Sequence, residues 1–107
     1  MNVKTNHPEQ CQLAVAGLKT VFDPEIDLNV VDLGLIYEIH FFDEPKKVNC
    51  LMTLSTQFCP MGESIVDSVK YSLESNFPDR VVEVTLTFDP PWTADCISEE
   101  GRAYLNS

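Results

Sequence analysis

The stretch VNCLMTLSTQFCPMGESIVDSVKYSLESNF, residues 48–77, contains the change of pattern that decides the fold. Over 48–56 apolar and polar side chains alternate, which is typical of a strand with one buried face. Over 60–77 apolar residues recur with a helical period, which predicts an amphipathic helix. The repeating residues are Met61, Ile65, Val69, Leu73 and Phe77. A strand is therefore expected to lead directly into a helix, with Cys59 at the boundary.

Cys59 is expected at or near the N-cap of this helix, because Pro60 suits the first helical position. Unpaired N–H groups and the positive end of the helix dipole favour an anion there, which lowers a cysteine pKa. The hydroxyl of Thr56 could donate to the thiolate. Cys59 can accordingly act as a nucleophile or metal ligand, or it can be a small residue that packs at a helix start. Spacing alone leaves both interpretations open.

The flanking sequence supplies the remaining elements. Residues 8–22 carry a helical stripe, with Asn6 or His7 as its cap, and the helix is expected to end at Asp23-Pro24. Strands are predicted at 35–42 and 81–88, a hairpin connection at 43–47 and a short helix at 98–105. Val82, Val84, Leu86 and Phe88 are expected to face the core.

The order α-β-β-α-β-α predicts an α+β fold, a two-layer sandwich with helices on one face of a small mixed sheet. If the strand at 81–88 lies beside and parallel to the strand at 48–56, the crossover through the helix at 60–77 is expected to be right-handed. Residues 1–107 show no repeat or linker, so one domain is expected.

Charge and composition restrict the partners. The formal net charge is −10, from 17 Asp and Glu against 7 Lys and Arg. With no basic patch, the chain is a poor partner for nucleic acid or for an anionic membrane surface. No apolar run has the length of a spanning helix, and residues 1–10 lack the apolar core of a signal peptide. A cytoplasmic location is expected.

The four cysteines, at 11, 50, 59 and 96, include no C-x-x-C pair and are expected to be free thiols. Cys11 and Cys50 lie on apolar faces and are expected to be buried. Cys96 is expected to be more exposed, and its role is undecided. Asp23 and Glu25, around Pro24, fit either a solvated turn or a functional acidic pair. The stretch 89–92, DPPW, fits either a stiff loop that tucks its indole onto the core or part of a site.

Three segments together resemble a known family. They are DPEIDLNVVDLGLIYEI (23–39), MTLSTQFCPMG (52–62) and DPPWTADCISEEGRAYL (89–105). The sequence resembles the SufT/PaaD-type family of iron–sulfur cluster assembly proteins, also called the metal–sulfur cluster biosynthesis family. The D-P-E, D-L-G, T-x-x-C-P and D-P-P-W motifs of that family match in order, and the resemblance extends from about Glu9 to Leu105.

The resemblance implies an accessory factor for iron–sulfur cluster assembly or delivery to client apoproteins. It implies that Cys59 is the reactive residue and the metal ligand, with Thr56, Asp23 and Glu25 close by. The sequence departs from the family at Phe58, where a small residue is common, at Cys96, where a larger apolar residue is common, and at Gly101, where alanine is expected. The role of the last helix is therefore open.

Two other functions compete with the assembly factor. One is a small thiol enzyme with Cys59 as nucleophile and Asp23 or Glu25 as proton acceptor, although no histidine is placed to activate the thiol. The other is a structural subunit of an oxygenase or assembly complex. A non-enzymatic assembly factor is favoured.

A cluster needs about four ligands, so one thiolate cannot hold it. Any iron or iron–sulfur cluster is expected to be transient. It would be shared with the assembly machinery, a client apoprotein or a second copy in a homodimer.

Overall fold

The computed structural model describes residues 3–23, 27–54, 62–89 and 91–105. Within them a four-stranded sheet has the order β1-β4-β5-β6. Its strands are β1 (Lys4–Thr5), β4 (Ile36–Asp43), β5 (Lys46–Met52) and β6 (Val81–Leu86). β1 is parallel to β4, β4 is antiparallel to β5, and β5 is parallel to β6. The sheet is therefore mixed, as predicted, and β6 lies beside and parallel to β5.

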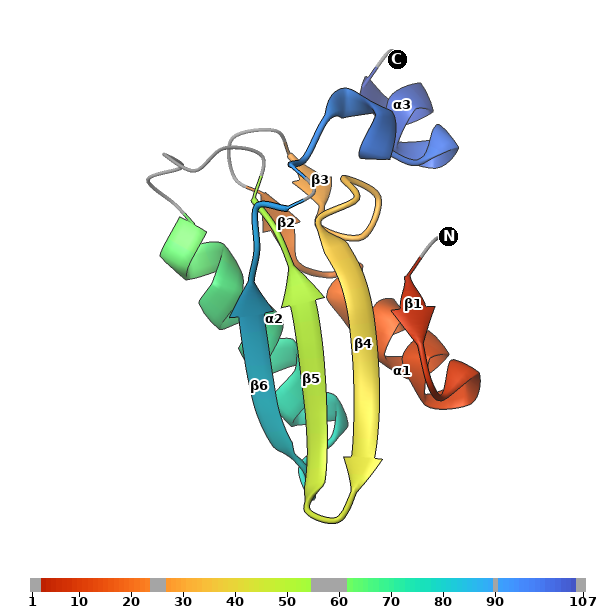
Figure 1. The fold of residues 1–107 in the computed structure, drawn as a ribbon. Helices are drawn as coiled ribbons and strands as arrows, with labels where there is room; N and C mark the ends of the chain where they lie inside the picture. The colour runs from red at the N-terminus through yellow and green to blue at the C-terminus, as the bar shows by residue number, and fades with distance from the viewer. Residues whose placement is uncertain (1–2, 24–26, 55–61, 90, 106–107) are drawn as a thin grey trace.

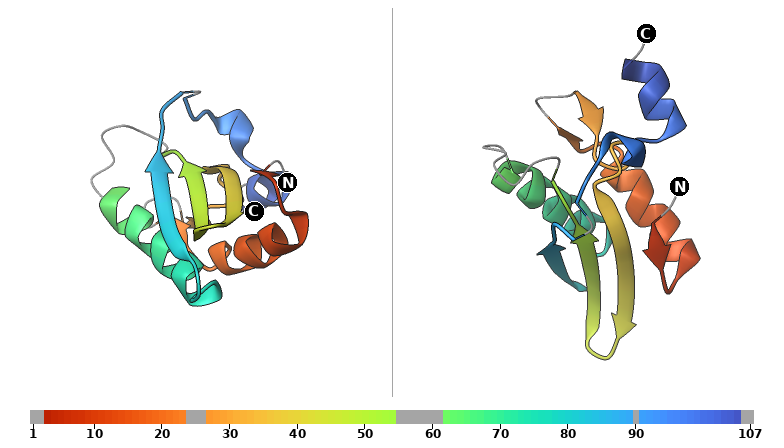
Figure 2. Two further views of the ribbon diagram at one scale, coloured as in Figure 1. Left: turned by 60° about the horizontal axis from the view of Figure 1, so that its bottom comes forward. Right: turned by 45° about the horizontal axis from the view of Figure 1, so that its top comes forward.

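Two helices, α1 (Pro8–Leu18) and α2 (Gly62–Asn76), cover one face of this sheet (Figures 1 and 2). A small hairpin of β2 (Phe22–Asp23) and β3 (Leu28–Asn29) lies near one end of the sheet. The 3-10 helix η1 (Ala94–Cys96) and α3 (Glu99–Leu105) follow β6 and lie beyond the same end. This arrangement confirms the predicted α+β class with a small mixed sheet.

The core lies between the helices and the sheet. The apolar period of α2 is confirmed, since Ile65, Val69 and Leu73 are buried. The alternation of β5 is confirmed in the same way by Val48, Cys50 and Met52. Burying an apolar side chain of this size stabilises the fold by about 1.5–3 kcal/mol relative to leaving it exposed. The apolar faces of α2 and β5 therefore pack against each other between the helices and the sheet.

α1 begins as predicted and ends earlier than predicted. His7 is its N-cap, with Nδ1 accepting from the Gln10 N–H at 3.3 Å, and Pro8 follows. The prediction of a helix over 8–22 was wrong at its end, because α1 stops at Leu18. The chain then turns into β2, and Phe22 pairs with Asn29 while its ring is 53% exposed. A β-branched and aromatic run, residues 20–22, suits a strand better than a helix end.

The boundaries of the strands also shift. β4 and β5 extend into the predicted connection 43–47, leaving only Glu44-Pro45 between them. β6 ends at Leu86, which shares the parity of Val82 but is 41% exposed, so the expectation that Leu86 belongs to the core was wrong. Within the described ranges no strand lies beyond β6, so no neighbouring strand covers an apolar side chain at its end.

Across the described residues, no helix combines the length and the apolar character that crossing a bilayer requires.

Candidate functional site

The motif-bearing segments meet at one end of the molecule. The carboxyl ends of β5 and β6, the β2–β3 hairpin, the turn at 32–34 and the chain from Trp92 into α3 all lie at the end drawn uppermost in Figure 1. Thr87 N donates to Met52 O at 2.9 Å, and Thr53 N donates to Leu35 O at 2.8 Å, which joins these segments directly. Two described residues flank the Cys59 segment. Leu54 lies two residues after the end of β5, and Gly62 is the first residue of α2.

Thr56, Cys59, Pro24 and Glu25 lie outside the described residues. Their expected roles, including the N-cap position of Cys59, therefore remain predictions. The first described residue of α2 is Gly62, so the helix expected over 60–77 is observed from that residue to Asn76.

Asp23 is the one predicted site residue that the structure describes. It lies in β2 opposite Leu28, and only 1% of its surface is exposed. Its carbonyl oxygen accepts from Asp27 N at 2.8 Å, and Asp27 has a φ of +60°. A solvated turn is therefore wrong for Asp23. A carboxyl group this deeply buried is costly unless it is hydrogen-bonded or paired, so its position is strongly specified.

The turn at 32–34 is held by a polar network around Asp32. One carboxylate oxygen accepts from Asn29 Nδ2 at 2.6 Å, and the other accepts from Ser98 Oγ at 2.9 Å. Asp32 N donates to Asn29 Oδ1 at 2.9 Å, and Ser98 N donates to Asp32 O at 2.8 Å. Ser98 Oγ also accepts from Gly101 N at 3.0 Å, which caps α3. Asp32 thus joins the hairpin to the C-terminal helix.

Gly34 brings the turn and η1 into contact. Its φ is +79°, a conformation that costs a residue with a side chain about 1–2 kcal/mol. A Cβ atom there would overlap the Cys96 carbonyl oxygen and lie 2.7 Å from the Cys96 carbonyl carbon. The D-L-G motif therefore needs glycine for both its conformation and its neighbour.

Trp92 also contacts the 32–34 turn and packs against the core at this end of the sheet. Its Nε1 donates to Leu33 O at 2.7 Å, and the half-buried ring packs against the core. This confirms the interpretation of the DPPW stretch as a loop that tucks its indole onto the core. The adjacent Asp89 is exposed, with its N–H donating to Thr87 Oγ1 at 3.2 Å.

The described cysteines divide by burial. Burial raises the pKa of the Cys11 thiol, and it raises the pKa of Cys50 to about 12. Both are buried, as predicted, and both are protonated near neutral pH. Cys96 is exposed in η1. The described residues contain no group of three or more His, Cys, Asp or Glu side chains arranged to hold a metal ion.

Cys96 borders a hollow of about 720 Å³ between the 31–37 segment and the chain from Asp95 to Glu100. Tyr37 also lines it, and its pKa is raised first by burial and then by the nearby Cys96. Among the described residues that line it, Lys19 is the one cation, and the acidic side chains include Asp32 and Glu99. The hollow is therefore acidic, and it suits neither a phosphate nor another anion.

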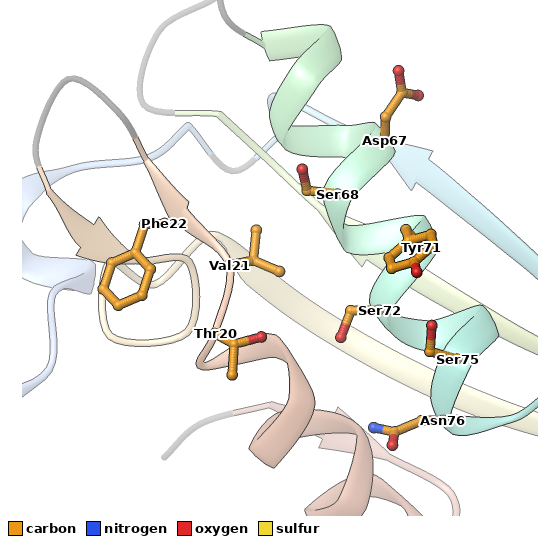
Figure 3. Close-up of a pocket in the computed structure, with 9 residues that line it drawn as sticks. All are labelled: Thr20, Val21, Phe22, Asp67, Ser68, Tyr71, Ser72, Ser75 and Asn76. Atoms are coloured by element: carbon orange, nitrogen blue, oxygen red, sulfur yellow. The ribbon is translucent and has the colours of Figure 1, made fainter.

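A second hollow, of about 680 Å³, lies between the chain after α1 and the exposed side of α2 (Figure 3). Phe22 and the 72% exposed Tyr71 stand on either side of it. Its other lining residues are mainly hydroxyl-bearing or small, namely Thr20, Val21, Asp67, Ser68, Ser72, Ser75 and Asn76. The described residues that line it include no cysteine or histidine, and so no nucleophile of the kind that the Cys59 motif predicts.

Sequence reasoning missed Asn29 and Ser98 as organisers of this end. Both had a local signal: Asn29 lies three residues before Asp32, an Asx-type spacing, and Ser98 precedes two glutamates at a helix start. Both bond to Asp32, and the bond from Ser98 joins residues 66 positions apart, which no local pattern contains.

Comparison with known proteins agrees with this geometry. The family model described as iron–sulfur cluster assembly protein matches residues 14–86. An Fe-S protein maturation auxiliary factor of Porphyromonas gingivalis is 42% identical over 91 residues, covering 85% of this chain and 86% of that protein. The Fe-S protein maturation auxiliary factor SufT of Staphylococcus aureus is 38% identical over 85 residues, covering 79% and 96%.

A solved structure shows the same fold. The crystal structure of a DUF59 domain from Bacillus anthracis superposes with a TM-score of 0.81 at 32% identity, covering 90% of each chain. The matched range contains Asp23, the 32–34 turn and the T-x-x-C-P motif, and the fold agrees over nearly the whole chain. This chain belongs to the iron–sulfur cluster assembly protein family.

Proposed function

We propose that the protein is an accessory factor that assists iron–sulfur cluster assembly or delivery to client apoproteins, acting through the Cys59 thiolate. The relatives named as Fe-S protein maturation factors support this role at 38–42% identity. The cluster or iron is cargo, held briefly and passed on.

The observation that carries the proposal is the convergence of the family's motifs at one end of the sheet. Asp23 is buried in the hairpin, Asp32 and Gly34 fix the turn, and Trp92 is hydrogen-bonded to that turn. In the sequence, the segment that contains Cys59 lies between Leu54 and Gly62, so it follows β5 and precedes α2. A functional loop is usually positioned by a rigid scaffold, which supports a functional role for the segment that connects β5 to α2.

The ligand count determines how cargo would be held. Cys11 and Cys50 are buried and have raised pKa values, so neither supplies a thiolate near neutral pH. Cys59 and the exposed Cys96 remain. A cluster needs about four ligands, so it would be completed by the assembly machinery, by a client or by a second copy of this chain. Cargo held in this way exchanges readily.

Complementation of a strain that lacks the protein tests the role of Cys59. We expect Cys59→Ser to fold within about 1 kcal/mol of the wild type, because serine is a good N-cap, and to fail to support maturation of an iron–sulfur client enzyme. Cys96→Ser is the matched control for loss of an exposed thiol. Full complementation by Cys59→Ser would remove the thiolate from the mechanism. A collapse of thermal stability would show that Cys59 is structural.

Anaerobic reconstitution with iron and sulfide tests the cargo. We expect visible absorption that is lost on gel filtration or on addition of an apo client, with iron bound at less than one cluster per chain. A stable stoichiometric cluster on a monomer would contradict the ligand count. The same spectrum from Cys59→Ala would show that other residues hold the cluster.

A further inference from the structure

The two edge regions of the four-stranded sheet differ in whether other backbone or side-chain groups pair with them. On the β4 side, β1 pairs with Glu38 and Ile39, and the Asn6 side chain continues that protection. Asn6 Nδ2 donates to Phe41 O at 2.8 Å, and Phe41 N donates to Asn6 Oδ1 at 2.8 Å. On the other side, β6 is the last strand, and among the described residues no strand pairs with its outer edge. In the part of the chain that the structure describes, one edge is therefore covered by a strand and the other is not.

The hydrogen bonds of β6 show which of its backbone groups point outward. Thr87 N donates to Met52 O, so the backbone of Thr87 faces β5. Backbone orientation alternates along a strand, and Met52 lies opposite Leu86 in the parallel register. Glu83 and Thr85 therefore face β5 as well. The N–H and C=O groups of Val82, Val84 and Leu86 point away from the sheet.

β6 lacks the features that normally prevent an open edge from pairing. It contains no proline, no lysine and no bulge, and its sequence is VVEVTL. Its single charge, Glu83, is paired with Lys47 Nζ at 2.9 Å, which leaves the strand close to neutral. Val82 is buried, Val84 is half-buried and Leu86 is 41% exposed, so the face toward the helices becomes less covered along the strand.

We propose that this edge is a dimerisation surface that pairs antiparallel with β6 of a second copy, with Val84 on the two-fold axis. In this register Val84 faces Val84 of the partner subunit, and Val82 faces Leu86 of the partner subunit. All three outward-pointing residues then exchange backbone bonds, about six between the chains. The apolar face continues across the junction and covers Leu86, which the monomer leaves exposed.

The register is specified by charge as well as by backbone groups. A shift that centres Glu83 places two like charges directly opposite each other and leaves about four bonds. In the proposed register Glu83 instead faces Thr85 of the partner subunit, on the open face of the sheet. Self-pairing of this kind is an isologous two-fold contact, which closes the edge of both copies and stops further addition.

The strength of the contact follows from its size and charge. One pair of six-residue strands is smaller than a standard interface, and each copy carries a net charge of −10. We expect a reversible dimer with a dissociation constant of about 10 µM to 1 mM, which tightens as salt screens the repulsion. An interface held by surface ion pairs would weaken with salt instead.

Sedimentation of the full chain under reducing conditions, from about 10 µM to 1 mM, measures the dimer. Val84→Pro removes an outward N–H and keeps the bonds to β5, so we expect a folded monomer. Thr85→Lys places a cation opposite Glu83 and is expected to tighten the dimer about 2- to 10-fold, while Thr85→Glu weakens it by a similar factor. Ser75→Lys and Ser75→Glu are the controls, because they change the net charge equally at an exposed position on α2.

Amide hydrogen exchange gives a second readout within the strand. The N–H groups of Val84 and Leu86 are expected to gain protection as concentration rises, whereas those of Glu83 and Thr85 are protected at every concentration. A wild-type chain that stays monomeric at about 1 mM overturns the proposal. A dimer that Val84→Pro leaves intact, or one to which both Thr85 variants respond as the Ser75 controls do, overturns it equally.

Discussion

Gly34→Ala is the substitution that most directly tests the frame of the candidate site. The new Cβ would lie 2.7 Å from the Cys96 carbonyl carbon, where ordinary contacts are 3.4 Å or longer, so the backbone of η1 must retreat. Retreat pulls Ser98 away from Asp32, which breaks the backbone bond of 2.8 Å and the side-chain bond of 2.9 Å. Each bond contributes about 1 kcal/mol, and the φ of +79° costs alanine about 1–2 kcal/mol.

These contributions predict a loss of about 3–4 kcal/mol in the free energy of unfolding. For a domain of this size the midpoint of thermal unfolding should fall by at least about 12 °C. Urea unfolding followed by tryptophan fluorescence measures the loss, because Trp92 is the one tryptophan and is bonded to the same turn.

Gly17→Ala is the matched control for the same chemical change. Its Cβ would lie 2.5 Å from Asn76 Nδ2, so the Asn76 side chain must give up its bond to Leu13 O, and the preference of a helix for alanine, about 1 kcal/mol, offsets that loss. We expect a net change within about 1 kcal/mol. If Gly34→Ala lost no more stability than Gly17→Ala, the close packing of the turn against η1 would be refuted.

Three further predictions concern the thiols and the indole. Under native conditions an alkylating reagent should modify Cys96 and leave Cys11 and Cys50 unmodified, as peptide mass analysis can show; modification of all three at equal rates would contradict their burial. The folded pKa of Cys50 is raised from 9.0 to about 12, so its contribution to stability is complete below pH 9 and is lost as pH rises toward 12, by up to about 1.4 kcal/mol per pH unit. Urea titrations between pH 8 and 10.5 measure that slope, and Cys50→Ala should flatten it. Trp92→Phe keeps the aromatic packing and leaves Leu33 O without its donor, so stability should fall by about 1–2 kcal/mol in thermal unfolding; no change would mean that the bond contributes nothing.

Periodicity in the sequence predicted the layers well, because it reports burial directly. The stripe of α2 and the alternation of β5 both placed their buried residues correctly. The cap of α1 was predicted as Asn6 or His7, and the structure selects His7, whose ring nitrogen accepts from Gln10 N. Each of these signals depends on residues that are close in the sequence, so the sequence pattern alone contains it.

The misplaced residues are those whose environment depends on distant segments. Phe22 continues the apolar stripe of α1, yet it pairs with Asn29 in a hairpin, where strand pairing outweighs helical continuation. Leu86 has the parity of a core residue and is exposed because no strand lies beyond β6 among the described residues. The bond from Ser98 to Asp32 spans 66 positions, so it could not be read from either motif alone.

Two hydrogen bonds, from Trp92 to Leu33 and from Ser98 to Asp32, determine where the protein can be truncated at its C-terminal side. The family match ends at residue 86, so a domain boundary taken from it would discard the chain that holds the 32–34 turn. A truncated product of that kind would expose Leu33, which is fully buried, and would leave Asn29 and Asp32 as the remains of a broken network. Aggregation of such a fragment would result from the loss of the C-terminal chain that bonds to the 32–34 turn, and it would not show that the complete domain is unstable. Expression and fusion boundaries should therefore keep the chain through Leu105.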